Sequence, residues 1–316
     1  MPGFLRCLQR VKYVRTVVTS IAYVASLLVR IPKADVVHAF SASYYSFLLA
    51  PLPALLIARL FGRPCILNYR SGEAPDHLAN WPLSRYLIAR LPTRIVVPSG
   101  YLVAVFGQFG IAAHSIPNFV PIEQLSFRPR EPLTPAFLSN RNLESLYNVG
   151  CILRAFQLIQ SEFPEARLTI VGDGAQRSEL ENLCSEMRLS RVEFVGRVPS
   201  ERMPDYYRNS DVYLNSPNID NMPTSIIEAF ACGLPVVTTN AGGIPYIVDQ
   251  GRTGLMVGMN DHAGLAGAAI SLLKEPATAL RMARAARAEC EDKYVWPRVR
   301  AAWERCYRQL SMRTVR

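Results

Sequence analysis

Short apolar runs rich in β-branched residues alternate with helical stretches along this chain, and this alternation limits the folds open to it. In the first part such runs occupy 35–40, 64–69 and 94–98. In the second part they occupy 136–139, 167–171, 192–195, 212–215, 235–239 and 254–257. Strands that alternate with helices are typical of parallel sheets joined by crossover helices. The sequence therefore predicts an α/β fold.

A proline-rich segment separates the two series of strands. Residues 121–136 carry four prolines among mixed charges, which is the composition of a linker. A chain of 316 residues also exceeds the size at which a single core usually stops growing. We therefore predict an N-terminal domain over residues 1–130 and a C-terminal domain over 131–295. A last amphipathic helix, within residues 296–316, is predicted to cross back to the N-terminal domain.

All of the excess positive charge lies in the N-terminal part. Residues 1–130 hold 14 Lys and Arg against 4 Asp and Glu, whereas residues 131–316 hold 21 of each kind. This asymmetry predicts a local anionic partner such as a membrane surface or a phosphate-bearing substrate. Nucleic acid is not predicted as a partner, because the basic excess lacks the interleaved aromatic residues of a stacking surface.

Residues 16–29 are uncharged and lie between Arg15 and Arg30. This stretch is shorter than the roughly 20 residues of a membrane-spanning helix. We favour a helix packed on a sheet over a helix that lies on a membrane surface with Tyr13 and Tyr23 at the interface. A signal peptide is the third interpretation, and no small-x-small cleavage site follows to support it.

The cysteines and histidines give no sign of a metal site. The seven cysteines are widely spread without a C-x-x-C pair, which predicts buried thiols in a reducing compartment and a cytoplasmic location. The four histidines are far apart and show no metal-ligand spacing. We therefore predict neither a metal nor a cofactor.

Local signals also predict where helices begin and end. Residues 47–61 predict a helix whose start is interrupted by prolines and which ends at Gly62. Ser225 and Glu228 form an S-x-x-E pair, the pattern of a capping box at a helix start. Gly233 then follows the last turn in the position of a C-terminal cap.

The densest chemical signal surrounds this last helix. Asp220 stands eight residues before Glu228, and a turn with two glycines, 241–243, follows the next predicted strand. Bare backbone N–H groups in such a turn can approach a phosphate. In α/β sheets, ligands bind where strand ends face helix N-termini. Each feature alone is common in ordinary proteins, but their combination favours a binding site.

These residues resemble the donor-site signature of family 4 retaining glycosyltransferases. The resemblance is carried by Asp220, by residues 228–237 (EAFACGLPVV) and by residues 241–245 (AGGIP). It covers nearly all of residues 136–310 and extends more loosely over 35–120. It implies the GT-B fold, in which two Rossmann-like parallel-sheet domains face a cleft. It also implies transfer of a sugar from a UDP- or GDP-linked donor, which is a substrate, to an acceptor hydroxyl with retention of configuration.

The resemblance also implies roles for particular residues. Glu228 would accept hydrogen bonds from the ribose hydroxyls, and Asp220, where the family usually has Glu, would hold hydroxyls of the transferred sugar. Arg141 would clamp the pyrophosphate, whose charge grows in the transition state. These three are the predicted catalytic residues. Further donor-binding residues are predicted at Gly172, Gly174, Arg197, Val198, Asn221, Met222, Pro223, Thr224, Gly242 and Gly243.

Two side chains depart from the family's pattern. Tyr147 stands six residues after Arg141, where the family usually has a Lys that shares the pyrophosphate. Arg154, Arg197 or Arg70 could supply the missing charge. Arg70 itself stands where the family often has a His near the reacting sugar. We predict that Arg70 lies on the acceptor side of the cleft.

The N-terminal domain is expected to be incomplete. The family has a strand and a glycine loop before the stretch that matches 35–38, and this chain does not show them. We favour a truncated or misplaced start over a sheet built without that strand. His38 is interpreted as a buried, hydrogen-bonded residue or, as a second interpretation, as a cleft residue on the acceptor side. Asn118 is interpreted as a turn residue.

The sequence as a whole predicts a glycosyltransferase of cell-surface glycan or glycolipid synthesis. Its acceptor would be a saccharide or a lipid-linked saccharide, and the protein would be cytoplasmic or peripheral on the inner face of the membrane. A catalytically impaired nucleotide-sugar-binding scaffold of the same fold is the alternative, kept open by Tyr147 and the missing strand. A sugar-nucleotide 2-epimerase is disfavoured because the several acids and histidines of such sites are not found.

Overall fold

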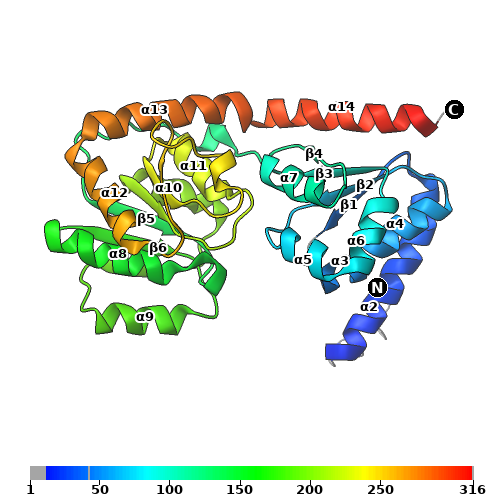
Figure 1. The fold of residues 1–316 in the computed structure, drawn as a ribbon, viewed down its shortest axis with the longest axis horizontal. Helices are drawn as coiled ribbons and strands as arrows, with labels where there is room; N and C mark the ends of the chain where they lie inside the picture. The colour runs from blue at the N-terminus through cyan, green and yellow to red at the C-terminus, as the bar shows by residue number, and fades with distance from the viewer. Residues whose placement is uncertain (1–11, 42, 315–316) are drawn as a thin grey trace. The chain divides into compact units, whose positions relative to one another are not determined.

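The structure, a computed structural model, describes residues 12–41 and 43–314. The chain divides into two compact units (Figure 1). The N-terminal unit comprises Met1–Ile116 and Ala302–Arg316, and the C-terminal unit comprises Pro117–Ala301. The division therefore lies just before the proline-rich segment, and the end of the last helix groups with the N-terminal unit.

The N-terminal unit is built on a parallel sheet of four strands in the order β1-β2-β3-β4. The strands are β1 (Val37–Ser41), β2 (Cys65–Tyr69), β3 (Arg94–Val97) and β4 (His114–Ser115). The first three lie where the apolar runs of the sequence predict them, and the short β4 lies outside those runs. Among the described residues β1 pairs only with β2, so it forms an edge of the sheet.

Helices of the N-terminal unit pack around this sheet. They are α2 (Lys12–Arg30), η1 (Ile31–Lys33), α3 (Tyr45–Leu49), α4 (Pro51–Leu60), α5 (Ala74–Asn80), α6 (Pro82–Arg90) and α7 (Gly100–Gln108). The single helix predicted over 47–61 is wrong, because the chain forms two helices that meet at Ala50. Pro51 lacks the N–H that would continue the first helix and disfavours helical geometry in the residue before it.

The C-terminal unit contains a parallel sheet of six strands in the order β10-β9-β8-β5-β6-β7. The strands are β5 (Ala136–Asn140), β6 (Arg167–Val171), β7 (Val192–Gly196), β8 (Val212–Asn215), β9 (Val236–Thr239) and β10 (Leu255–Val257). From β5 the chain proceeds outward to β7 and then returns to β8 on the other side of β5. The carboxyl ends of β5 and β8 therefore flank a topological switch point, where open α/β sheets bind ligands.

Helices cover both faces of this second sheet. They are η2 (Ile122–Gln124), η3 (Ser145–Tyr147), α8 (Val149–Glu162), α9 (Arg177–Glu186), η4 (Ser200–Arg202), α10 (Met203–Arg208), α11 (Thr224–Cys232), η5 (Ile244–Tyr246), α12 (His262–Lys274), α13 (Pro276–Lys293) and the beginning of α14 (Trp296–Thr314). Tyr213 of β8 packs with α10, α11 and α13, whereas its neighbours Val212 and Leu214 pack with α8 and α12. Successive residues of a strand point to opposite faces, so each face has its own core. Figure 1 shows α8 and α13 on opposite sides of the sheet.

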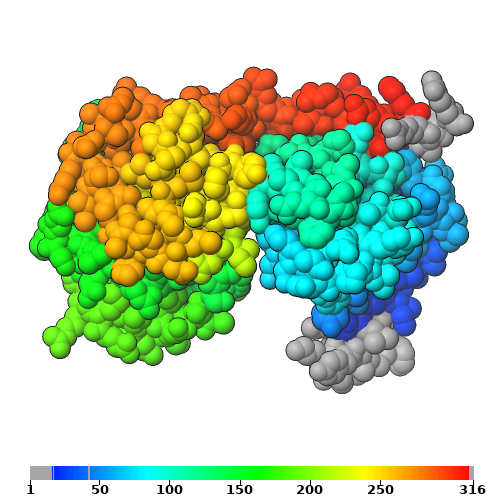
Figure 2. Space-filling view, in the orientation of Figure 1, coloured from blue at the N-terminus to red at the C-terminus, as the bar shows by residue number. Residues whose placement is uncertain are grey.

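The first described helix lies at the surface of the N-terminal unit. Dark-blue atoms of α2 are visible there in the space-filling view (Figure 2). Val24 and Leu27 of α2 pack against the core of the unit, and the helix contacts α4 and η1. No helix in the described part of the chain is long and apolar enough to cross a membrane.

Candidate active site

Three loops at the carboxyl edge of the C-terminal sheet carry Arg141, Asp220 and the predicted two-glycine turn. Arg141 follows β5, loop 216–223 follows β8, and loop 240–243 follows β9. Because β8 is the neighbour of both β5 and β9, the three loops begin side by side. Residues that the sequence separates by about a hundred positions thus meet at the switch point.

Arg141 and Asp220 form an ion pair across this switch point. The Nη2 atom of Arg141 contacts Oδ2 of Asp220, and each side chain is only 11% exposed. The Nη1 atom of Arg141 also donates to Oγ of Ser225, at 3.2 Å. Burial raises the pKa of Asp220, while Arg141 and the backbone N–H of Asn221 oppose this rise. The carboxylate is thus held close to a cation in a largely dry setting.

Glu228 is held by a hydrogen-bonded chain that starts at β5. The hydroxyl of Tyr207 donates to Oε2 of Glu228 at 2.6 Å, and Nδ2 of Asn140 donates to the same hydroxyl at 2.7 Å. Burial raises the pKa of Glu228, and the hydrogen bond from Tyr207 opposes the rise. Burial also raises the pKa of Tyr207 well above its ordinary value, so this side chain stays a donor.

Tyr207 and Asn140 were not predicted from the sequence. Tyr207 lies on the short helix α10 and is fully buried, so its pattern in the sequence is that of an ordinary core residue. Asn140 is the last residue of β5, next to Arg141. Its position at a strand end was the one available signal.

The predicted capping box at α11 is wrong. The helix begins at Thr224 after Pro223, and no side chain caps its N-terminus. The hydroxyl of Ser225 is instead engaged by Arg141, and the carboxylate of Glu228 by Tyr207. The side chains of Ser225 and Glu228 are thus bonded to Arg141 and Tyr207 and do not cap the helix. At the other end, Gly233 adopts the left-handed conformation with φ +74, as predicted.

The predicted donor-site glycines bring backbones close together. A Cβ on Gly172 would lie 2.0 Å from the carbonyl oxygen of Arg141, and one on Gly174 would lie 2.4 Å from that of Leu143. A Cβ on Gly243 would lie 1.8 Å from the carbonyl oxygen of Asn221. Only glycine permits these approaches, so these three residues hold the Arg141 and Asp220 loops in place.

The amide of Gly243 already has a partner within the protein. It donates to the carbonyl of Asp220 at 3.0 Å. A donor phosphate would have to compete with that carbonyl. Gly242 precedes it in the left-handed conformation with φ +50, in the same turn. Contact of this turn with a phosphate stays a prediction.

The segment after Asp220 is largely buried. Asn221 and Met222 are 5% and 7% exposed, and Pro223 leads into α11, whose first residue, Thr224, is exposed. Asn118 does more than turn the chain, because its Nδ2 donates to the carbonyl of Met222 at 2.9 Å. This contact ties the chain entering the unit to the Asp220 loop.

Arg197 and Val198 follow β7, at the end of the same sheet. Arg197 is exposed, whereas Val198 packs against the core on the α11 side. Arg154, considered as a substitute cation, is exposed on α8. Among the described residues, neither Arg154 nor Arg197 forms an ion pair with Asp220, whose partner is Arg141.

His38 and Arg70 lie in the N-terminal unit. Nδ1 of His38 is 2.6 Å from the hydroxyl of Tyr307, and Nε2 is 3.1 Å from Nδ2 of Asn68. Burial first, and Arg70 second, lower the pKa of His38 to about 4, so the ring is neutral near neutral pH. A substrate contact would therefore have to displace Tyr307 or Asn68. Arg70 follows β2 and its side chain is exposed.

Within residues 12–41 and 43–314, no three His, Cys, Asp or Glu side chains are grouped so that they could hold a metal ion.

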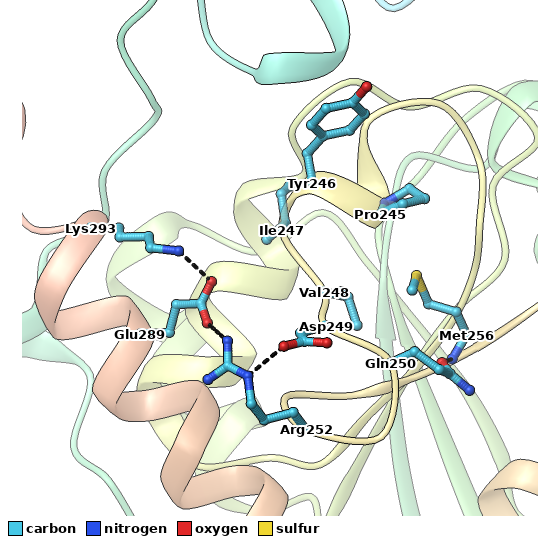
Figure 3. Close-up of a pocket in the computed structure, with 10 residues that line it drawn as sticks. All are labelled: Pro245, Tyr246, Ile247, Val248, Asp249, Gln250, Arg252, Met256, Glu289 and Lys293. Carbon is cyan, nitrogen blue, oxygen red and sulfur yellow. Dashed lines mark hydrogen bonds and ion pairs between the residues drawn. The ribbon is translucent and has the colours of Figure 1, made fainter.

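A separate pocket of about 410 Å³ lies between η5 and α13 (Figure 3). Its lining residues are Pro245, Tyr246, Ile247, Val248, Asp249, Gln250, Arg252, Met256, Glu289 and Lys293. Figure 3 shows Glu289 between Arg252 and Lys293, while Arg252 also reaches Asp249. The charges of this pocket thus neutralise one another, and none of the predicted catalytic residues lines it.

Two Rossmann-like parallel-sheet units, the second with a polar site at its switch point, define the GT-B class of α/β proteins. The chain belongs to the family Glycosyl transferases group 1, which it matches over residues 124–289. It is 30% identical to the glycogen synthase of Mycobacterium tuberculosis over 87% of this chain and 69% of that protein. It is 28% identical to the sulfoquinovosyl transferase SQD2 of Arabidopsis thaliana, over 84% of this chain but 54% of the relative.

A solved structure confirms the predicted fold. The complex of Anabaena Alr3699/HepE with UDP-glucose superposes with a TM-score of 0.77 at 19% identity, covering 92% of this chain and 81% of the other. At this identity the likeness concerns the fold alone. The prediction of two Rossmann-like domains is thereby confirmed, and the family match confirms the prediction of a glycosyltransferase.

Proposed function

We propose that this glycosyltransferase moves a sugar from a UDP- or GDP-linked donor to an acceptor hydroxyl with retention of configuration. The observation that carries the proposal is the single cluster formed by Arg141, Asp220, Ser225, Tyr207 and Glu228 at the switch point. It offers a fixed cation for a diphosphate and two partly buried carboxylates for hydroxyl groups. A nucleoside diphosphate sugar carries both kinds of group on one molecule.

The proposed roles follow from the charge of each side chain. Arg141 neutralises the leaving diphosphate, whose charge grows as the glycosidic bond breaks. Asp220 accepts hydrogen bonds from hydroxyls of the transferred sugar, and Glu228 accepts them from the ribose. Residues 221–224 and the turn at 242–243 line the sugar and phosphate, and Arg197 and Val198 lie beside the base.

The proposed reaction requires no protein nucleophile. The bond from the anomeric carbon to the phosphate oxygen breaks, and the acceptor oxygen bonds to the same face of that carbon. The acceptor proton passes to the departing phosphate oxygen. The protein's contribution is then positioning and charge stabilisation, which together can account for large rate enhancements. The UDP-glucose bound to the structural neighbour supports a nucleotide-linked donor here.

The acceptor is proposed to be a saccharide or a lipid-linked saccharide at a membrane. Support comes from α2, on which Ile21, Leu28 and Val29 are 65%, 44% and 63% exposed. Ile21 and Leu28 are seven residues apart and so share one helix face. An apolar helix face within a basic segment is typical of helices that lie on anionic membranes. We place the protein at the inner face of the membrane, in cell-surface glycan or glycolipid synthesis.

Labelled nucleotide sugars test the proposed reaction directly. The protein is incubated with UDP- and GDP-linked sugars and extracted lipid-linked acceptors, and products are followed by NMR of the anomeric proton. We expect a product with the donor's anomeric configuration, and slow donor hydrolysis without acceptor. Nucleotide binding with neither transfer nor hydrolysis would favour the non-catalytic scaffold, and an inverted product would contradict retention.

A further inference from the structure

The aromatic ring of Tyr147 lies against the guanidinium of Arg141. The Cζ atom of Arg141 lies 4.0 Å from the centroid of the Tyr147 ring. Asp220 and Ser225 bind the two terminal nitrogens of the same guanidinium. The Nε atom is buried and has no hydrogen-bond partner among the described residues. One donor of this arginine is thus left for a further acceptor.

The backbone fixes the Tyr147 ring relative to Asp220. Tyr147 ends η3, and Asn148 follows in the left-handed conformation with φ +47. The carbonyl of Leu146 accepts the backbone N–H of Asn218 at 2.8 Å, and the carbonyl of Asn148 accepts the hydroxyl of Ser216 at 2.8 Å. The loop of Tyr147 is therefore bonded to the loop that leads into Asp220.

Arg141 is the cation that pairs with a carboxylate of the site. Among the described residues it is ion-paired with Asp220, whereas Glu228 is bonded to the neutral hydroxyl of Tyr207. A diphosphate that binds at this cluster would meet the guanidinium of Arg141 beside two carboxylates. Its affinity would then depend on how well that guanidinium is oriented, since a rigid guanidinium loses less entropy on binding.

We propose that Tyr147 is a positioning residue whose ring orients Arg141 for the donor diphosphate by a cation–π contact. This inference rests on the proposed function. When the donor binds, Arg141 exchanges its contact with Asp220 for the phosphate oxygens and keeps its contact with the ring. Asp220 is thereby released toward the sugar hydroxyls. Tyr147 itself touches no reacting atom.

The size of the effect follows from the geometry of the contact. A desolvated cation–π pair contributes about 1–2 kcal/mol, and about 1.4 kcal/mol corresponds to a tenfold change in affinity. We therefore expect Tyr147→Leu to weaken binding of UDP or GDP by about five- to thirtyfold. Tyr147→Phe keeps the ring and is expected to recover most of that loss.

Calorimetric titration of the full chain with UDP and with GDP, over a series of salt concentrations, tests the proposal. The variants are Tyr147→Leu, Tyr147→Phe and Tyr147→Lys, with Tyr147→Met as a second non-aromatic variant should the leucine variant not fold. Tyr147→Lys adds a second cation, so its nucleotide affinity should fall more steeply with salt than that of the wild type. The readout that a merely space-filling role would not move is the rescue by Tyr147→Phe, because leucine and phenylalanine both fill the space but only phenylalanine keeps an aromatic face.

Tyr86→Leu is the matched control. Arg90 lies over the Tyr86 ring in the N-terminal unit at 5.7 Å, and Tyr86 is 59% exposed. Loss of this surface pair should leave nucleotide affinity unchanged. Equal affinities of the leucine and phenylalanine variants, or no loss with leucine, would overturn the role of Tyr147. A wild type that binds neither nucleotide would instead overturn the proposed function.

Discussion

Replacement of Tyr207 by Phe should weaken the C-terminal unit and the site together. The substitution removes only the hydroxyl, which donates to Glu228 at 2.6 Å and accepts from Asn140 at 2.7 Å. A hydrogen bond to a charged group contributes about 1.5–3 kcal/mol, and a neutral one about 1 kcal/mol. Because the ring stays in place, no cavity of note forms. We expect the free energy of unfolding to fall by about 3 kcal/mol.

The stability that Tyr207→Phe loses relative to wild type should also grow with pH. Burial raises the folded-state pKa of Glu228, so its contribution to stability is greatest in acid and declines as pH rises through that pKa. The hydrogen bond from Tyr207 limits the rise. Without the hydroxyl of Tyr207 the pKa of Glu228 rises further, and the decline of stability with rising pH becomes larger. The stability difference from wild type should therefore be larger near pH 8 than near pH 5.

Urea denaturation followed by circular dichroism measures both effects. Tyr213→Phe is the matched control, since Tyr213 is also fully buried and its hydroxyl has no hydrogen-bond partner among the described residues. This control should cost much less than Tyr207→Phe at either pH. The reasoning is refuted if the two variants lose equal stability, or if the loss in Tyr207→Phe does not change with pH.

Three further substitutions test separate parts of the site. Asp220→Asn removes the carboxylate that competes with the nucleotide for Arg141. UDP or GDP should then bind severalfold more tightly in calorimetry, while transfer should fall by about a hundredfold. Weaker nucleotide binding would contradict the proposal that Arg141 exchanges Asp220 for the phosphate oxygens. Glu228→Gln removes a partly buried carboxylate whose pKa is raised. The variant should therefore be about 1 kcal/mol more stable than wild type near neutral pH, and this gain should shrink in acid. Its affinity for the nucleotide should fall about tenfold. Gly243→Ala places a Cβ 1.8 Å from the carbonyl oxygen of Asn221 and should abolish transfer. A Cβ at Gly267 would meet nothing within 4 Å, so Gly267→Ala should stabilise helix α12 by about 0.5–1 kcal/mol in thermal unfolding. Equal transfer activity and equal thermal stability of the two variants would refute the close-approach argument.

The fold was predictable because its strands carry a strong local signal. Nine apolar runs bounded by turn residues match nine of the ten strands of the described residues, and the two-residue strand β4 is the one outside these runs. Parallel strands buried on both faces read as continuous apolar runs, which makes them conspicuous. The division between the units was less predictable, because Pro117 opens the second unit before the proline-rich composition begins.

Helix ends were predicted less well where side chains serve the site. Ser225 and Glu228 have the pattern of a capping box, yet Arg141 and Tyr207 bind them. Local patterns describe interactions within a few residues, whereas these contacts join positions 84 and 21 residues apart. Tyr207 escaped prediction for the same reason, since no neighbouring residue indicates that its hydroxyl meets Glu228.

The stacking of Tyr147 on Arg141 likewise could not be derived from the sequence. The two residues are six positions apart on an irregular loop, and the sequence alone shows only the loss of an expected cation. The loop geometry that aims the ring depends on hydrogen bonds to residues 216–218. Tyr147, which departs from the family's pattern, thus makes a specific contact with Arg141 in the structure.

A crystal structure of the complex with UDP or GDP tests the central claim most directly. The account predicts that the diphosphate contacts Arg141 and the ribose hydroxyls contact Glu228, with Arg141 still stacked on Tyr147. A nucleotide bound in the pocket between η5 and α13, or one that leaves the ion pair of Arg141 and Asp220 intact, would contradict it.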